Sequence, residues 1–291
     1  MTCLKCNALV RNIKLIGEFL NVFSQPQILP GNKKNAHMDK IAVITVVRDY
    51  EMYTRLIKNN INFQSAVLYD LDNTAENKSI SVRYNEFINA YDFSQETWFV
   101  FCHEDWELKE DIAHKLAFLD KNSLYGPIGT VLLDQKSRFL LRSLGGVKNS
   151  DKEGKNIRFY GRKCKDGTSV ETFDCQCLIV HSGLIEKYGL RFDENLSFDL
   201  YVEDFCANAK EKFGIASRIV NLKCRHYSYG NIRERFYDSF EYLQDKYAAA
   251  NYSYSNGLIT KTFGKKLSLP IKRDTQGFIN SLKRKMLFLG K

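Results

Sequence analysis

The stretch that decides the fold is IAVITVV, residues 41–47, in which every residue is apolar or β-branched. A continuous run of this kind is typical of a strand buried on both faces, as in a mostly parallel sheet. Shorter runs at 65–69 and 97–101 predict two more strands, and helices are predicted at 51–59 and 79–90. Strand and helix therefore alternate, which predicts an α/β fold that begins with a βαβαβ unit.

Farther along the chain the pattern predicts helices over 110–122 and 201–213 and strands over 170–180 and 215–223. The stretch Gly145–Gly167 is charged, contains several glycines and has no clear period. We expect a mostly parallel sheet flanked by helices. In such open sheets, ligands bind beyond the carboxyl ends of the parallel strands.

The net charge of +9 is unevenly distributed along the 291 residues. Residues 257–291 carry nine Lys or Arg against one acid, and residues 1–40 carry six against two. Residues 41–256 are close to neutral, with 28 basic and 31 acidic side chains. Because a nucleic-acid binder usually carries its basic charge on the folded domain, this distribution predicts no nucleic-acid partner. It favours an anionic membrane surface or a protein partner instead.

Four regions are expected from these patterns. Residues 1–37 form an amphipathic extension and a linker, and 38–230 form the catalytic domain, so that both Met1 and Met38 are candidate starts. Residues 231–256 form a helical C-terminal part of the body, and 257–291 form a basic amphipathic tail. This tail gathers several apolar side chains on one helical arc: Phe278, Ile279, Leu282, Met286 and Leu289.

The cellular setting follows from hydropathy and cysteine use. No segment reaches the roughly 18 uninterrupted apolar residues of a membrane span, so we expect a cytoplasmic protein. Its tail either attaches it peripherally to the inner membrane face, binds a partner, or packs on the protein's own surface. The eight cysteines are scattered, and only Cys3 and Cys6 have a metal-like spacing. Without a second such pair, we interpret the cysteines as free thiols in a reducing compartment.

A candidate metal motif follows the predicted third strand in FVFCHEDWEL, residues 99–108. It places His103, Glu104 and Asp105 at the strand end, where a carboxylate can hold Mg²⁺ or Mn²⁺ against a diphosphate. The alternative is that Asp105 caps a helix running through residues 106–119, because Asp is a favoured N-cap residue.

Three other segments carry candidate groups. Glu203 and Asp204 stand in the first turn of a predicted helix, where the helix dipole favours acids whether or not one serves as a general base. His226 follows a predicted strand and is able to bind a metal or a phosphate, or to be structural. The segment YDLDNT, residues 69–74, is either turn chemistry or a contact with base and ribose.

Together these segments resemble the family 2-like glycosyltransferases with the GT-A fold, from about Ile41 to Ser228. IAVITVV resembles the opening strand of that family, YDLDNT the nucleoside-binding turn, and NKSISVRYNEFINA the second helix. FVFCHED resembles the strand that ends in the DXD-type metal motif, which one branch writes as His, any residue, Asp. VETFDCQCLIV resembles the acceptor-side strand, YVED the motif that carries the base, and CRHYS the closing histidine.

The resemblance implies a role for each matching residue. It implies Asp204 as the general base with Glu203 as its neighbour, and a Mn²⁺ or Mg²⁺ cofactor bound by Asp105 and His226. Asp174 would face the acceptor or the donor sugar. The nucleotide would be contacted by Asp70, Asp72, Asn73, Asn85, His103 and Glu104.

The resemblance also implies the reaction. A sugar would pass, with inversion, from a uridine diphosphate sugar to a hydroxyl of a glycan or lipid-linked glycan, in the synthesis of a surface polysaccharide or lipopolysaccharide-type glycan. Two alternatives remain: a metal-dependent nucleotidyltransferase or phosphohydrolase, and a non-catalytic module that binds a glycan or a membrane. The sugar, acceptor and linkage depend on the shape of loops such as Gly145–Gly167.

Overall fold

The computed structural model describes residues 39–132, 141–230, 234–247, 252–254 and 257–259. The predicted extension over 1–37 and nearly all of the predicted basic tail lie outside these residues. The four predicted regions and the membrane-binding role of the tail therefore stay predictions. Within the described ranges, no helix has both the length and the apolar character needed to cross a bilayer.

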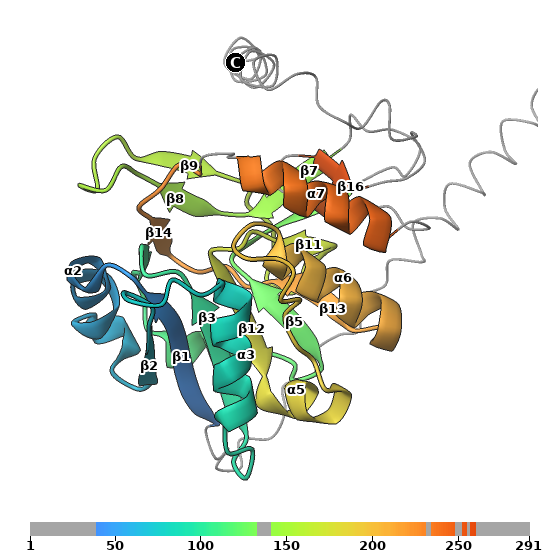
Figure 1. Ribbon diagram of the computed structural model, residues 1–291. Coiled ribbons are helices and arrows are strands. Elements are labelled where there is room, and N and C mark those ends of the chain that lie inside the picture. Colours follow the sequence, from blue (N-terminus) through green and yellow to red (C-terminus); the bar gives the residue numbers. More distant parts are fainter. Residues whose placement is uncertain (1–38, 133–140, 231–233, 248–251, 255–256, 260–291) are drawn as a thin grey trace, which may run out of the picture. The chain divides into compact units, whose positions relative to one another are not determined.

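A seven-stranded sheet forms the centre of the part of the chain that the structure describes (Figure 1). Its strands lie in the order β2 (Val67–Asp72), β1 (Lys40–Val47), β3 (Thr97–Cys102), β12 (Cys177–His181), β5 (Ser123–Gly126), β13 (Ala216–Ile219) and β10 (Ser169–Val170). β2, β1, β3, β5 and β13 run in one direction, whereas β12 and β10 run in the other. The predicted α/β fold class with a mostly parallel sheet is confirmed.

The continuous apolar run of β1 is explained by two cores, one on each face of the sheet. Ala42, Ile44 and Val46 pack into one core, and Val43 and Val47 pack into the other. The first core is covered by α3 (Ile80–Ala90), α5 (Ser182–Tyr188), α6 (Tyr201–Phe213) and α7 (Glu234–Lys246). The second is covered by α2 (Tyr50–Tyr53), its continuation η1 (Thr54–Lys58), η2 (Ile61–Phe63) and α4 (Ile112–Leu116).

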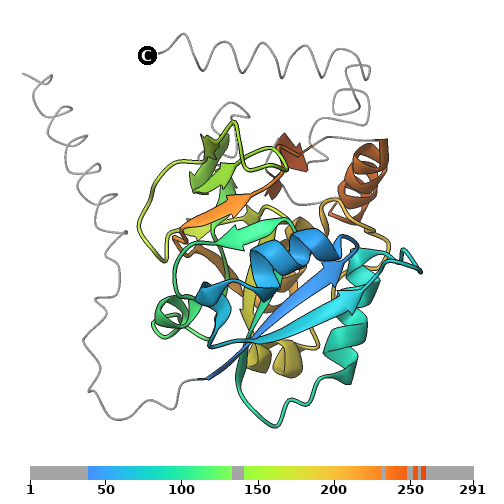
Figure 2. The same ribbon diagram turned by 90° about the vertical axis from the view of Figure 1, so that its left-hand side faces the viewer.

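Three smaller sheets complete the described part of the chain. A four-stranded sheet contains β4 (Trp106–Leu108), β14 (Cys224–His226), β8 (Val147–Asn149) and β9 (Arg158–Tyr160). Figure 2 shows these strands stacked above α2. A second sheet contains β11 (Thr172–Phe173), β6 (Ile128–Leu132) and β7 (Leu141–Gly145), and a third pairs β15 (Tyr252–Tyr254) with β16 (Gly257–Ile259).

Two predicted elements are wrong in extent. The helix predicted over 110–122 is only α4, whose N-cap is Asp111, and residues 106–108 form a strand in which Trp106 and Leu108 are both fully buried. Asp105 therefore caps no helix. The strand predicted over 170–180 is divided among β10, β11 and β12, because these pieces pair with strands of two different sheets.

Candidate metal centre

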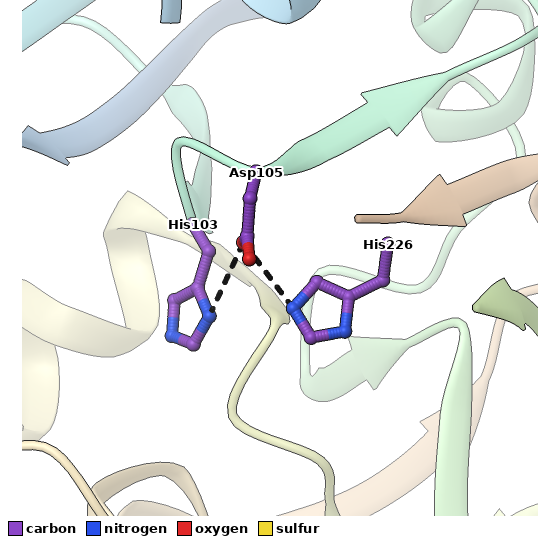
Figure 3. A group of neighbouring side chains, drawn as sticks. All are labelled: His103, Asp105 and His226. Carbon is purple, nitrogen blue, oxygen red and sulfur yellow. Dashed lines mark ion pairs between the residues drawn. The ribbon is translucent and has the colours of Figure 1, made fainter. Parts of the chain in front are cut away.

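Three side chains from two distant segments of the sequence converge at the carboxyl end of β3 (Figure 3). His103 and Asp105 lie in the turn between β3 and β4, and His226 is the last residue of β14. Antiparallel pairing sets His226 opposite Trp106, and the Tyr227 amide donates to the Asp105 carbonyl at 2.8 Å. Asp105 Oδ1 lies 3.2 Å from His226 Nε2 and 3.9 Å from His103 Nδ1.

The three groups influence one another's charge. Burial alone would raise the pKa of Asp105, but His226 and His103 outweigh this effect and hold it well below its ordinary value. Burial lowers the pKa of His103 to about 4, so that this imidazole is neutral near pH 7. For His226, burial lowers the pKa, but the adjacent Asp105 carboxylate more than offsets this and raises it.

Hydrogen bonding assigns the tautomer of His103. The Tyr201 hydroxyl donates its single hydrogen to the Cys175 carbonyl at 2.8 Å, so it accepts from His103 Nε2 at 2.9 Å. A neutral imidazole with a proton on Nε2 has a lone pair on Nδ1. That lone pair lies beside the ionised Asp105, and two such groups side by side favour a cation between them.

The donor set fits a divalent transition metal. The candidate ligand atoms of His103, Asp105 and His226 all lie within 4.8 Å of one another. Imidazole nitrogens suit transition metals such as Zn²⁺, Fe²⁺ and Ni²⁺, and carboxylate oxygens suit Mn²⁺ and Mg²⁺. Because Mg²⁺ prefers an all-oxygen set, two imidazoles beside one carboxylate favour a transition metal such as Mn²⁺ over Mg²⁺. The sequence indicated Asp105 and His226 as ligands and set His103 beside the diphosphate. The geometry adds His103 to the candidate ligands, and the His-x-Asp spacing was the signal for it.

A second group of possible ligands, formed by Asp39, Glu96 and His181, lies at the opposite end of the strands. A cation of the protein itself, the Lys121 side chain, already neutralises this group. The Lys121 ammonium lies 2.9 Å from an Asp39 carboxylate oxygen and 2.6 Å from one of Glu96. We therefore assign no metal to this group.

Two further acids lie around the metal centre. Asp174 is partly exposed and lies two residues before Gln176, whose carbonyl accepts from the His103 amide at 3.1 Å. Its charge opposes the burial that lowers the pKa of His103 and adds to the effect of Asp105 on the pKa of His226. Glu203 is 2 % exposed and accepts a hydrogen bond from Cys175 Sγ at 3.0 Å. Burial raises the pKa of Glu203 to about 8, so it holds a proton near neutral pH.

Asp204, expected from the sequence to be the base, has structural partners. Its Oδ1 lies 2.7 Å from Lys246 Nζ and accepts from the Tyr247 hydroxyl at 2.7 Å, and the residue is 1 % exposed. Burial raises its pKa while Lys246 opposes the rise. Both partners come from the α7 region, so the carboxylate joins α6 to α7.

Three of the expected nucleotide contacts have local partners. Glu104 Oε2 accepts from the backbone amides of Arg48 and Asp49 at 2.6 and 2.8 Å, and so holds the turn that follows β1. Asp72 caps its own turn by accepting from the amide and the hydroxyl of Thr74. Asp70 stands exposed at the edge strand β2, within hydrogen-bonding reach of Tyr50.

The two expected asparagines serve the scaffold. Asn73 is buried, and its amide bonds both the N–H and the carbonyl of Lys78, closing the loop before α3. Asn85 is buried and bonds both backbone groups of Phe192 as well as Glu194. With these amide groups paired inside the protein, we leave both residues out of the proposed site.

Sequence reasoning missed two residues, Tyr201 and Cys175. Tyr201 orients the His103 ring, and Cys175 donates a hydrogen bond to Glu203. Tyr201 is the first residue of the YVED segment and is 1 % exposed. A tyrosine in a first helical turn is ordinarily a core residue, so only the contact with His103 assigns its role.

Comparison with known proteins gives remote similarities. No protein-family model matches the chain, and no curated protein matches it. Among solved structures, residues 1–349 of S. aureus TarS are 12 % identical, with a TM-score of 0.47 over 71 % of this chain and 65 % of that one. A longer TarS structure is 12 % identical, with a TM-score of 0.44 over 71 % of this chain and 39 % of that one. A Bacillus anthracis protein described as a glucose-1-phosphate thymidylyltransferase, in complex with a sucrose, is 10 % identical, with a TM-score of 0.32 over 67 % and 79 %. None of these similarities is strong enough to assign a function.

Proposed function

We propose that this protein is a glycosyltransferase that binds a nucleotide diphosphate sugar with a divalent metal ion and transfers the sugar to a glycan hydroxyl. The observation that carries the proposal is the convergence of His103, Asp105 and His226 at the carboxyl end of β3. In an open, mostly parallel sheet this is the end at which ligands bind. The lone pair of His103 Nδ1 beside the ionised Asp105 supports a cation there.

The donor would lie across the carboxyl ends of β1, β2 and β3. His103, Asp105 and His226 would hold Mn²⁺, which supplies Lewis-acid stabilisation of the departing diphosphate. Glu104 shapes the nearby turn after β1 through its two backbone hydrogen bonds. Asp70, exposed on β2, is our candidate for the contact with the ribose hydroxyls of a uridine nucleotide.

The acceptor hydroxyl needs a carboxylate to take its proton, and we place this role on Asp174. It is partly exposed, lies two residues before the Gln176 carbonyl that accepts from the His103 amide, and has no ion-pair partner among the residues that the structure describes. Asp204 is bound to Lys246, and Glu203 already holds a proton near pH 7. A positioned base contributes roughly 10²–10⁴-fold to the rate.

The test is titration calorimetry with UDP in Mn²⁺, in Mg²⁺ and in chelator. We expect binding in Mn²⁺ at least tenfold tighter than in chelator, and tighter than in Mg²⁺. Asp105→Asn should abolish this difference. Asp39→Asn, in the group filled by Lys121, is the matched control and should retain it. Equal UDP affinity with Mn²⁺ and with chelator would contradict the metal assignment.

The reaction is then identified by its products. Incubation with a panel of nucleotide sugars and glycan acceptors should release UDP and yield an acceptor larger by one sugar. Release of UMP or pyrophosphate would indicate a phosphohydrolase or a nucleotidyltransferase. Tight UDP binding with no turnover of any donor would indicate a non-catalytic module.

A further inference from the structure

A charged hairpin lies next to the metal centre and has no part in the reaction described above. It comprises β8, β9 and the residues that follow, 147–165, and is called the basic arm here (Figure 1). This arm contains seven Lys or Arg and two acids. The rest of the near-neutral span 41–256 contains 21 basic and 29 acidic residues, so the positive charge of the body is concentrated on the arm.

The basic side chains of the arm are free to bind a ligand. All seven are exposed, and none forms an ion pair with another described residue. Of the two acids, Asp151 is engaged in its own turn, because it accepts from the Lys155 amide at 2.6 Å and from Asn156 at 2.8 Å. Concentrated like charges without counter-ions create a positive potential that attracts anions.

Exposed apolar side chains lie among these charges. Ile157 and Phe159 on the arm are 48 % and 54 % exposed, and the neighbouring Tyr229 is 41 % exposed. The Arg158 guanidinium lies over the Tyr229 ring at 5.5 Å. Aromatic side chains present flat apolar faces that pack against the apolar faces of sugar rings. A surface that combines them with unpaired cations fits a ligand that is both a glycan and an anion.

The arm is attached directly to the strand that carries His226. Ser150 donates its amide hydrogen to the His226 carbonyl at 3.0 Å, and β8 pairs with β14 so that Asn149 is opposite His226. Arg158 is opposite Asn149 on the next strand. Residues in one register row share a face, and neighbouring strands are about 4.8 Å apart, so Arg158 stands about 10 Å from His226 along the sheet.

Two further contacts hold the arm in place. The Tyr229 hydroxyl donates to the Asn156 carbonyl at 2.5 Å, and Arg55 of η1 donates to the Lys152 carbonyl at 3.1 Å. These contacts join the arm to the segment after His226 and to the helix beside β1. A chain bound along the arm is thereby aligned with the metal centre.

We propose that the basic arm binds the acceptor, and that the acceptor is an anionic glycan carrying phosphate or carboxylate groups. The inference rests on the proposed transfer reaction and adds to it the chemical class of the acceptor. The cations of the arm pair with the anionic groups, Phe159 and Tyr229 pack against sugar rings, and the sheet directs the bound chain toward Asp174 and the centre.

The probes are carboxymethyl-dextran and unsubstituted dextran of the same length, titrated into the full chain at 50 and 300 mM salt. We expect the carboxymethyl form to bind at least tenfold more tightly at low salt, with the difference reduced at high salt because exposed charges are screened. The variant Lys152→Gln, Lys155→Gln, Arg158→Gln should lose at least tenfold in affinity. The control Lys58→Gln, Lys187→Gln, Lys212→Gln removes three exposed cations elsewhere and should bind normally.

Several outcomes would overturn the proposal. They are equal binding of the two dextrans, equal losses in the two triple variants, or tighter arm-dependent binding to phosphatidylglycerol vesicles or to a single-stranded oligonucleotide. UDP binding in Mn²⁺, measured on the same preparations, separates the two proposals. Arm-dependent binding of carboxymethyl-dextran without any UDP binding would remove the transfer reaction. UDP binding without dextran binding would remove the role of the arm.

Discussion

The His103 ring is held by Tyr201 through a 2.9 Å hydrogen bond between Nε2 and the hydroxyl, which directs Nδ1 toward Asp105. Tyr201 begins α6, and Leu200 before it adopts a left-handed conformation with φ of 63°. A leucine in this region is strained and persists only where the surrounding structure demands it. The strained turn at the start of α6 thus positions the Tyr201 hydroxyl for its hydrogen bond with His103.

Tyr201→Phe is expected to weaken Mn²⁺ binding by about tenfold without unfolding the protein. It removes the acceptor that fixes the His103 tautomer, and loss of such supporting contacts typically costs 10–100-fold in metal affinity. The measurement is electron paramagnetic resonance of free Mn²⁺ during titration. Tyr125→Phe is the control, because that buried hydroxyl accepts from the Asp120 amide at 2.9 Å and bonds neither His103 nor Tyr201. Equal affinities in the two variants would show that the bond to His103 is dispensable.

Asp174→Asn is expected to lower turnover by about 10²-fold or more while retaining UDP binding in Mn²⁺, as for loss of a general base. Asp204→Asn should retain far more activity, because its carboxylate is bonded to Lys246 and Tyr247. Initial rates with a saturating donor, corrected for the folded fraction, compare the two. The reverse ranking would return the base role to Asp204, as the sequence suggested.

Lys246→Met should destabilise the fold by about 3 kcal/mol, because it leaves the buried Asp204 carboxylate without its cation. The double variant with Asp204→Asn should recover part of that loss. Urea unfolding followed by far-ultraviolet circular dichroism gives the free energies. Lys187→Met, at an exposed position on α5, is the control. A loss in Lys246→Met as small as in the control would mean that the buried pair contributes little.

Glu203 should make the folded state less stable as pH rises. Burial raises its folded-state pKa from the ordinary 4.5 to about 8. The stability linked to its protonation is complete below about pH 4.5 and is lost as pH rises to 8. Glu203→Gln should remove this loss, so its advantage over the native chain grows across that window by up to about 1.4 kcal/mol per pH unit. Urea unfolding at pH 5, 6.5 and 8 is the measurement, and parallel profiles would contradict the buried, protonated carboxyl.

Local sequence patterns predicted a helix or strand correctly where the whole segment packs in one setting, within a single sheet or against a single core. The run at 41–47 is a strand because its alternate residues enter two cores, and α6 spans Tyr201–Phe213 as its periodicity indicated. Patterns failed at 170–180, where β10, β11 and β12 pair with different strands. An apolar run indicates burial but not the strand with which it pairs. The division of residues 170–180 into three strands could therefore not be predicted from the sequence.

The sequence by itself determined the α/β class, the position of His103 and Asp105 at the end of a buried strand, and the candidacy of His226. These conclusions depend only on hydrophobic period and on the types of side chain near one another in the chain. Only the tertiary structure decided that β14 pairs with β4, which brings His226 to Asp105. It also decided that the Asp204 carboxylate forms an ion pair with Lys246 and accepts a hydrogen bond from Tyr247. Those contacts join residues that are 42 or more positions apart in the sequence. Strand register and helix packing determine which of them form, and local sequence patterns do not encode either.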